Sequence, residues 1–279
     1  MRAKVMDSFN ELSYYSLFDI AEKARWKMTD LPWASFDKSK VTPELVSLIK
    51  TITIGECTTF NATRAFMDLF AEDLDFTQWI AVWLYEETKH PQALVRWLAC
   101  AGEPMSEQEQ LDARIITPMT QSQVEMLTFN IVSEIVASTL YQSFAKRVEE
   151  PLLKEIMISL GKDEARHSVG FEHYCKQYIE NADDPEKEKL TCLRAAWVFM
   201  QDDSFVQHPV YITLNRVKEQ ASDDMVDRAR QHITSRISKA IGVPIAGPEE
   251  FNAVYQEMRK RYKQSRQSSA LNTDAVRSV

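Results

Sequence analysis

The sequence is poor in the residues that interrupt helices. Its 279 residues include only six glycines and ten prolines, and these two residue types most often break helices and form turns. No segment alternates between polar and apolar residues as a β-strand does, and no internal repeat or heptad run is present. Leu, Ala, Met, Glu and Gln are frequent and favour helix. These features predict an all-α protein.

Cysteine pairs and long apolar runs are also missing. The four cysteines form no Cys-x-x-Cys pair, which excludes a zinc ribbon or a rubredoxin-type iron site and fits buried thiols in a reducing compartment. No signal-peptide core follows the first residues, and no uncharged apolar stretch of about eighteen residues exists. We therefore expect a cytoplasmic protein that is not an integral membrane protein. The net charge of −8 argues against a nucleic-acid partner.

Changes in composition divide the chain into four parts. Aromatic side chains are mixed into the first forty residues, and the last fourteen are rich in Ser and Gln. We expect a single helical domain over 1–265 and a flexible tail over 266–279. Within the domain we expect an N-terminal arm (1–40, with a helix near 8–28), a core of four long helices (42–180) and flanking helices (186–264).

Local signals mark the ends of the core helices. Thr42–Pro43 is a capping hydroxyl followed by proline at the first helical position, and Pro151 starts another helix. Ser106 and Glu109 have the spacing of a capping box. We expect an interruption at Thr117–Pro118 and a bend at Pro91, which removes a helical hydrogen bond.

Two Glu-x-x-His motifs stand out: Glu87 with His90, and Glu164 with His167. Residues three apart lie on one face of a helix, so each motif directs a carboxylate and an imidazole to one point. A single such motif carries little information. Two of them, each preceded by a helix with a further glutamate, match the ligand set of a di-metal carboxylate site in a four-helix bundle.

The two further glutamates are Glu56 and Glu134. Each falls on an otherwise apolar stripe of its helix, where a lone carboxylate is costly unless it is paired or coordinates a metal. Carboxylates offset the repulsion between two cations, and imidazole suits iron. Glu86 and Asp163, directly before the motifs, could accept the outer N–H of a ligand histidine.

These residues resemble the ferritin-like di-iron carboxylate superfamily and, within it, the soluble acyl-carrier-protein desaturases. The similarity spans roughly residues 42–215. It includes Trp79 and Trp83 before the first motif, the block 163–167, and the aromatic and Met segment near Met200–Tyr211.

The resemblance implies a ferritin-like four-helix bundle with additional flanking helices, holding two iron ions. One iron would take Glu56 and His90, the other Glu134 and His167, and Glu87 and Glu164 would bridge. A ferredoxin-like donor would reduce the centre. The centre would then use O₂ to remove hydrogen from an acyl chain, presented as a thioester of an acyl carrier protein. We also expect a homodimer.

One difference from the plant-type desaturases leaves open which reaction the centre would carry out. Plant-type desaturases have a threonine three residues after the third-helix glutamate, where this chain has Ala137. Ser138 instead resembles the active-site threonine of bacterial di-iron hydroxylases, and its hydroxyl could donate a hydrogen bond near the oxygen site. We therefore name Ser138 as a candidate catalytic residue. Hydroxylation or another C–H or N oxidation, and a mixed Mn/Fe centre, stay open.

Other members of the superfamily fit less well. A ribonucleotide reductase radical subunit would carry a tyrosine in place of Leu94, and an arylamine N-oxygenase a histidine in place of Leu160. A peroxide-scavenging rubrerythrin is disfavoured by the missing Cys-x-x-Cys pairs. Iron storage and a purely structural metal site are the distant alternatives.

Two basic segments could receive an acidic carrier protein, since complementary charge mainly speeds encounter. One holds Lys23, Arg25 and Lys27, and the other lies within 259–266. Each could equally be a solvated helix face. Apolar stripe residues could line a tunnel for an acyl chain or be plain core: Phe60, Leu94, Met157, Leu160 and Phe171.

Overall fold

The computed structural model describes residues 13–114, 120–200 and 223–277. Within these ranges the chain is helical and contains no β-strand, which confirms the all-α prediction. The α-helices are α2 (Ser13–Ala24), α3 (Pro43–Glu56), α4 (Thr59–Leu69), α5 (Leu74–Ala101), α6 (Glu107–Asp112), α7 (Gln123–Ala145), α8 (Pro151–Glu180), α9 (Pro185–Met200), α11 (Asp223–Ile241) and α12 (Phe251–Arg277).

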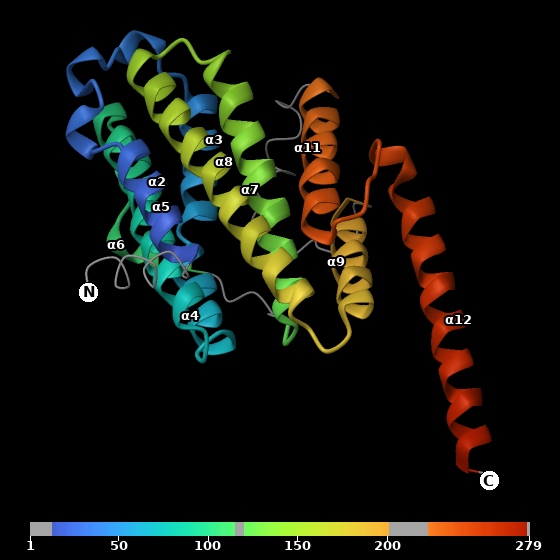
Figure 1. Ribbon diagram of the computed structural model, residues 1–279. Coiled ribbons are helices and arrows are strands. Elements are labelled where there is room, and N and C mark those ends of the chain that lie inside the picture. Colours follow the sequence, from blue (N-terminus) through green and yellow to red (C-terminus); the bar gives the residue numbers. More distant parts are fainter. Residues whose placement is uncertain (1–12, 115–119, 201–222, 278–279) are drawn as a thin grey trace.

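Helices α3, α5, α7 and α8 form a four-helix bundle. α7 packs along α8, α3 packs along α5, and α5 contacts α8, as the side-by-side ribbons of Figure 1 show. α4 continues the first bundle helix and also packs on α5. The fold is therefore the ferritin-like bundle with flanking helices that the sequence predicted.

Several helix ends lie where the sequence predicts them. The Thr42 side chain accepts a backbone hydrogen bond at the start of α3, and Pro43 is the first helical residue. Ser106 and Glu109 form the capping box of α6. Gly102 ends α5 with a φ of 90°, a left-handed conformation that glycine adopts without strain.

The first bundle helix is interrupted after Glu56, where the sequence had predicted one of four long core helices. The Thr58 hydroxyl donates a hydrogen bond to the Gly55 carbonyl oxygen at 2.7 Å, and the Thr59 hydroxyl donates to the Glu56 carbonyl oxygen at 3.0 Å. Threonine hydroxyls that bind nearby carbonyls compete with the helical hydrogen bonds. The resulting turn places Glu56 at the last position of α3.

Two other expected irregularities have different outcomes. Helix α5 is assigned without interruption through Pro91, and the bend stays a prediction. The break expected at Thr117–Pro118 lies outside the described residues, between the end of α6 and the start of α7.

Two apolar clusters fill the bundle on either side of the motifs. On α5, one cluster includes side chains from 76–83 and the other includes side chains from 93–98. On α8, the corresponding side chains come from 171–179 and 152–160. Because both Glu-x-x-His motifs lie between these stretches, their charged side chains form a polar layer between two apolar clusters.

The remaining helices flank the bundle. α2 packs on α5, while α9 and α11 pack against α7 and α8. α12 packs on α9 and extends away from the other helices (Figure 1). It is helical to Arg277, and the flexibility of the tail over 266–279 stays a prediction. Among the described residues, no helix has the length and apolar character to cross a membrane.

Candidate metal centre

The six predicted ligand side chains come together inside the bundle, and all are buried. They form two groups whose candidate ligand atoms lie within 4.8 Å of one another. We call these six side chains the ligand cluster. The first group is Glu56, Glu87, His90 and Glu164, and the second is Glu87, Glu134, Glu164 and His167.

The shared carboxylates, Glu87 and Glu164, lie between the two groups. They have the positions that carboxylates bridging two cations would need. The Glu87 Oε1 atom is buried, and among the described residues its one close nitrogen is His167 Nδ1 at 2.9 Å, an atom that would itself turn to a metal. An unsatisfied buried oxygen is costly, and a coordinated cation would satisfy it. The donor set of carboxylates and imidazoles therefore fits two metal ions.

Both histidine rings turn Nδ1 toward the ligand cluster. His90 Nδ1 lies 3.3 Å from Glu56 Oε2 and 3.3 Å from Glu164 Oε1. His167 Nδ1 lies 2.9 Å from Glu87 Oε1 and 3.3 Å from Glu164 Oε2. Each ring thus presents Nδ1 to two or more carboxylates, and Nδ1 is the atom available to a metal.

The opposite ring nitrogens face Glu86 and Asp163, which we call the outer acids. Asp163 Oδ2 lies 3.3 Å from His90 Nε2, and Glu86 Oε2 lies 3.0 Å from His167 Nε2. An acceptor at Nε2 holds the proton there and leaves Nδ1 free as a ligand. The sequence had suggested these partners, and the structure shows that each motif's acid faces the other motif's histidine.

The outer acids are ionised. Burial acts to raise their pKa values, but hydrogen bonds and charge from the facing histidines outweigh it. The pKa of Glu86 falls to about 2, with Arg166 contributing, and that of Asp163 falls below its usual range, with Lys89 contributing.

Within the ligand cluster, protons offset part of the negative charge. Burial raises the pKa of Glu56 to about 7. Burial and the nearby Glu164 charge raise the pKa of Glu134 well above its usual value. Glu164 keeps a pKa well below its usual value because, against the effect of burial, the His90 charge and several hydrogen bonds favour its ionised form.

The histidines gain the remaining protons. Although burial acts to lower it, the pKa of His90 is raised well above its usual value by the charges of Glu87 and Glu164. The pKa of His167 is raised well above its usual value by hydrogen bonds to surrounding carboxylates. Metal ligation requires a neutral imidazole and ionised carboxylates, so a bound cation would displace these protons.

Three side chains that hold the ligand cluster were not identified from the sequence. The Tyr141 hydroxyl donates to Glu56 Oε1. Trp83 Nε1 donates to Glu134 Oε1 at 3.2 Å, and the Thr59 hydroxyl, whose one proton is shared with the Glu56 carbonyl oxygen, lies 3.2 Å from Glu87 Oε2. Trp83 and Tyr141 lie on the same stripes as the motif and Glu134, which was the available signal. Their partners are on other helices, which one sequence does not reveal.

Ser138 lies at the contact between α7 and α8. Its hydroxyl donates a 2.9 Å hydrogen bond to the Gly161 carbonyl oxygen and accepts one from the Gln142 amide at 3.0 Å. The hydroxyl proton is therefore engaged by the backbone of the helix that carries the second motif. The catalytic role of Ser138 stays a prediction, and it requires this hydrogen bond to open.

The rubrerythrin family model matches residues 125–240, which include Glu134, Glu164 and His167. No curated protein and no solved structure matches. Rubrerythrin-type domains bind a di-iron centre, and the buried ligand cluster could hold two metal ions. The match does not support a particular relationship to acyl-carrier-protein desaturases, but together with the helical bundle it supports the ferritin-like di-iron superfamily.

Proposed function

We propose that this chain is a non-haem di-iron oxidoreductase that uses O₂ to desaturate an acyl chain presented as a carrier-protein thioester. The proposal of two metal ions rests on one observation. Two groups of buried ligands share Glu87 and Glu164, and each group adds one imidazole with Nδ1 turned inward. In this proposal Glu56 and His90 hold one iron, and Glu134 and His167 hold the other. Two bound irons supply one-electron redox chemistry with O₂.

The surrounding residues hold the ligands in place and exclude water. Tyr141 fixes one oxygen of Glu56, and Trp83 fixes one oxygen of Glu134. The apolar clusters on both sides keep the layer dry. A dry, rigid pocket limits side reactions and keeps each carboxylate from turning to solvent.

The acyl substrate is supported by the sequence resemblance and by the apolar surroundings. Of the side chains considered for a tunnel, Leu94, Met157, Leu160 and Phe171 are fully buried in the apolar clusters, on the helices that carry the two motifs, and Phe60 lies under the guanidinium of Arg114. Such surroundings suit an unactivated C–H bond better than a polar substrate.

Hydroxylation is the second candidate, and Ala137 with Ser138 favours it. In the hydroxylase-like reading, Ser138 would exchange its bond to Gly161 for one to the oxygen site. Replacing Ser138 with Ala then changes the ratio of oxygenated to desaturated product. An unchanged ratio would show that Ser138 has no role in choosing between the two products.

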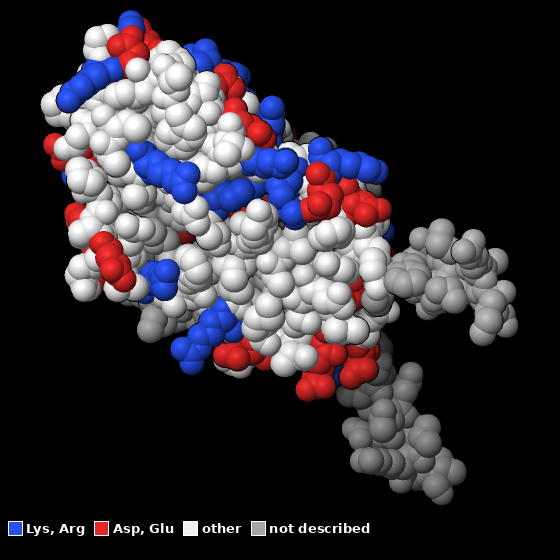
Figure 2. All heavy atoms as spheres, turned by 90° about the vertical axis from the view of Figure 1, so that its left-hand side faces the viewer, with Lys and Arg blue, Asp and Glu red and all other residues white. Residues whose placement is uncertain are grey.

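The proposed partners are a ferredoxin-like electron donor, an acidic acyl carrier protein and a second copy of the chain. Figure 2 shows Lys and Arg side chains gathered across the face seen from the left of Figure 1, where α2 lies. Lys23 and Lys27 are exposed, whereas Arg25 is engaged by Glu22 and by the Tyr85 ring. The basic residues within 259–266 are exposed on α12.

The centre is tested by metal analysis after anaerobic loading with Fe(II). We expect about two irons per chain, following the ligand count of such bundles. Glu134→Ala and His167→Ala should abolish the absorbance that O₂ produces and leave the helical circular dichroism largely intact. One zinc, or no metal, in the wild-type protein would refute the centre.

The reaction is tested by mass spectrometry of acyl thioesters incubated with reduced enzyme and O₂. Loss of two hydrogens indicates desaturation, and gain of one oxygen indicates hydroxylation. Stoichiometric iron without turnover of any acyl carrier substrate would reject both reactions and favour an iron-binding or structural role.

A further inference from the structure

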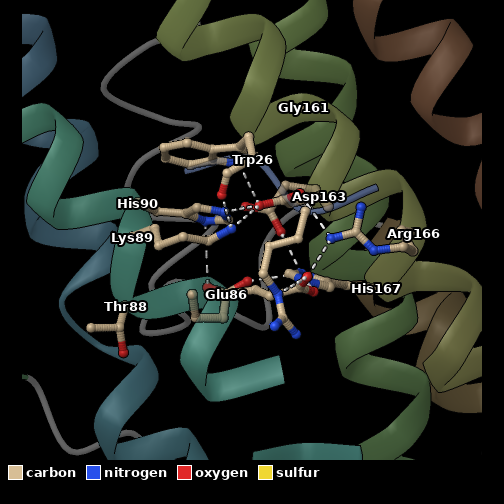
Figure 3. A network of polar contacts seen from close by, with 12 residues as sticks. Trp26, Glu86, Thr88, Lys89, His90, Gly161, Asp163, Arg166 and His167 are labelled. Carbon is tan, nitrogen blue, oxygen red and sulfur yellow. Dashed lines mark hydrogen bonds and ion pairs between the residues drawn. The ribbon is translucent and has the colours of Figure 1, made fainter. Parts of the chain in front are cut away.

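The two motifs share a pattern wider than Glu-x-x-His. Residues 86–90 and 163–167 both read acid, Glu, any residue, cation, His. The cations are Lys89 and Arg166, one residue before each histidine. Neither cation belongs to the ligand cluster, and both lie in the polar network drawn in Figure 3.

Arg166 contacts both outer acids. Its Nη2 atom lies 2.8 Å from Glu86 Oε1 and 2.8 Å from Asp163 Oδ1. The Arg166 side chain is 15% exposed, whereas those of Glu86 and Asp163 are 2% and 1% exposed. A single guanidinium group therefore contacts both buried carboxylates (Figure 3). A second one, that of Arg25, lies farther from Glu86, with its Nε atom 3.6 Å from Glu86 Oε1.

Lys89 contacts only one outer acid. Its Nζ atom lies 3.6 Å from Asp163 Oδ2 and 4.4 Å from the centre of the Trp26 ring. Trp26 itself donates Nε1–H to Asp163 Oδ2 at 2.8 Å. These two side chains therefore support the acid that faces His90, and not the acid that faces His167.

We propose that Arg166 is a positioning residue that couples the two metal positions by holding the acceptors of both ligand histidines. This rests on the proposed two-metal centre. Removing one partner from a buried ion pair leaves the other charge without compensation, so both outer acids lose their fixed positions when Arg166 is replaced. Both imidazoles then lose the acceptor at Nε2. Loss of such a partner typically weakens metal affinity about 10–100-fold.

The network predicts different effects for replacements at different points. Arg166→Met removes the charge at similar length and should weaken binding of both metal ions about 10–100-fold. Trp26→Phe removes one donor to Asp163 and should weaken only one of the two. Arg166→Lys keeps the charge but not the planar fork, and it should recover part of the affinity at both positions.

The test is an anaerobic titration of the full-length protein with Co(II), followed by calorimetry and by the visible absorption bands of bound cobalt. These readouts report binding and coordination without enzymatic turnover. Arg236→Met is the matched control, because Arg236 pairs with Glu172 at 2.8 Å on α11 and α8 and touches no ligand. It should bind two cobalt ions as the wild type does.

The outcomes separate the inference from the proposed centre. Wild-type protein that fails to bind two cobalt ions refutes the centre itself. Two wild-type sites with unchanged affinity in Arg166→Met, or with only one site weakened, overturn the coupling role alone. If Arg166→Met does not fold, as circular dichroism would show, Arg166→Lys decides: wild-type affinity at either position contradicts the inference.

Discussion

Glu150 is expected to be one of the most sensitive positions for stability, although it lies outside the ligand cluster. Its side chain is 0% exposed. Its carboxylate accepts hydrogen bonds from the backbone N–H groups of Leu152 and Leu153 at 3.3 and 2.7 Å. It also accepts hydrogen bonds from Trp97 Nε1–H at 2.7 Å and from the Asp37 backbone N–H at 2.9 Å. One carboxylate thus joins the start of α8, the end of α5 and the N-terminal arm.

The cost of Glu150→Ala follows from these bonds. Leaving the buried Trp97 indole N–H without an acceptor costs about 2 kcal/mol, and losing the cap of α8 costs about 1 kcal/mol. The sum of about 3 kcal/mol should lower the unfolding midpoint by about 6 °C for a chain of this size. Because α5 and α8 carry the two motifs, metal binding should weaken as well.

Thermal unfolding of the metal-free protein, followed by circular dichroism, measures this cost. Glu149→Ala is the matched control, since Glu149 is the preceding residue, its side chain is 75% exposed and it pairs with Lys40 at the surface. That change should leave the unfolding midpoint nearly unchanged, because exposed ion pairs contribute little to stability. Equal midpoints for the two variants would refute the role assigned to Glu150.

Three further changes test the packing and the charge of the bundle. Gly170→Ala should cost about 1–3 kcal/mol in denaturant unfolding, because the added Cβ would overlap the Trp79 ring; wild-type stability would contradict this packing. Tyr141→Phe removes the hydroxyl that donates to Glu56 and should weaken Co(II) binding about tenfold; unchanged affinity would exclude that support. Metal affinity should rise with pH through 7 and continue to rise above it, because Glu56 (pKa about 7) and the histidines, whose pKa values are raised well above the usual value, must lose protons on binding; calorimetry in buffers of different ionisation enthalpy should detect proton release, and its absence would oppose the protonation described.

The sequence alone was sufficient to predict the helical fold and to name the six side chains that meet in the ligand cluster. Helical periodicity marked Glu56 and Glu134 as lone acids on apolar stripes, because burying an unpaired carboxylate has few physical justifications. The same periodicity placed each histidine beside the glutamate three residues before it. Both inferences depend on one helix at a time, and for that reason they could be made without coordinates.

Contacts between helices could not be predicted in the same way. Tyr141 is 85 residues from Glu56 in sequence, and Trp26 is 137 residues from Asp163. Their pairing depends on the relative positions of packed helices, which periodicity does not set. The turn after Glu56 was missed for a different reason: threonine hydroxyls decided a local competition for carbonyls that the apolar pattern concealed.

The charges of the polar layer support two divalent cations rather than one. The outer acids, Glu86 and Asp163, have Lys89, Arg166 and Arg25 as nearby counter-charges, so they need no metal ion to balance them. The ligand cluster contributes four carboxylates and two imidazoles, which carry four negative charges when fully deprotonated. One divalent cation would leave two of these charges, which would have to be offset by retained protons, as on Glu56 and the histidines, or stay buried at considerable cost. Two divalent cations neutralise all four, so the second ion should bind more favourably than repulsion between the metals alone would suggest.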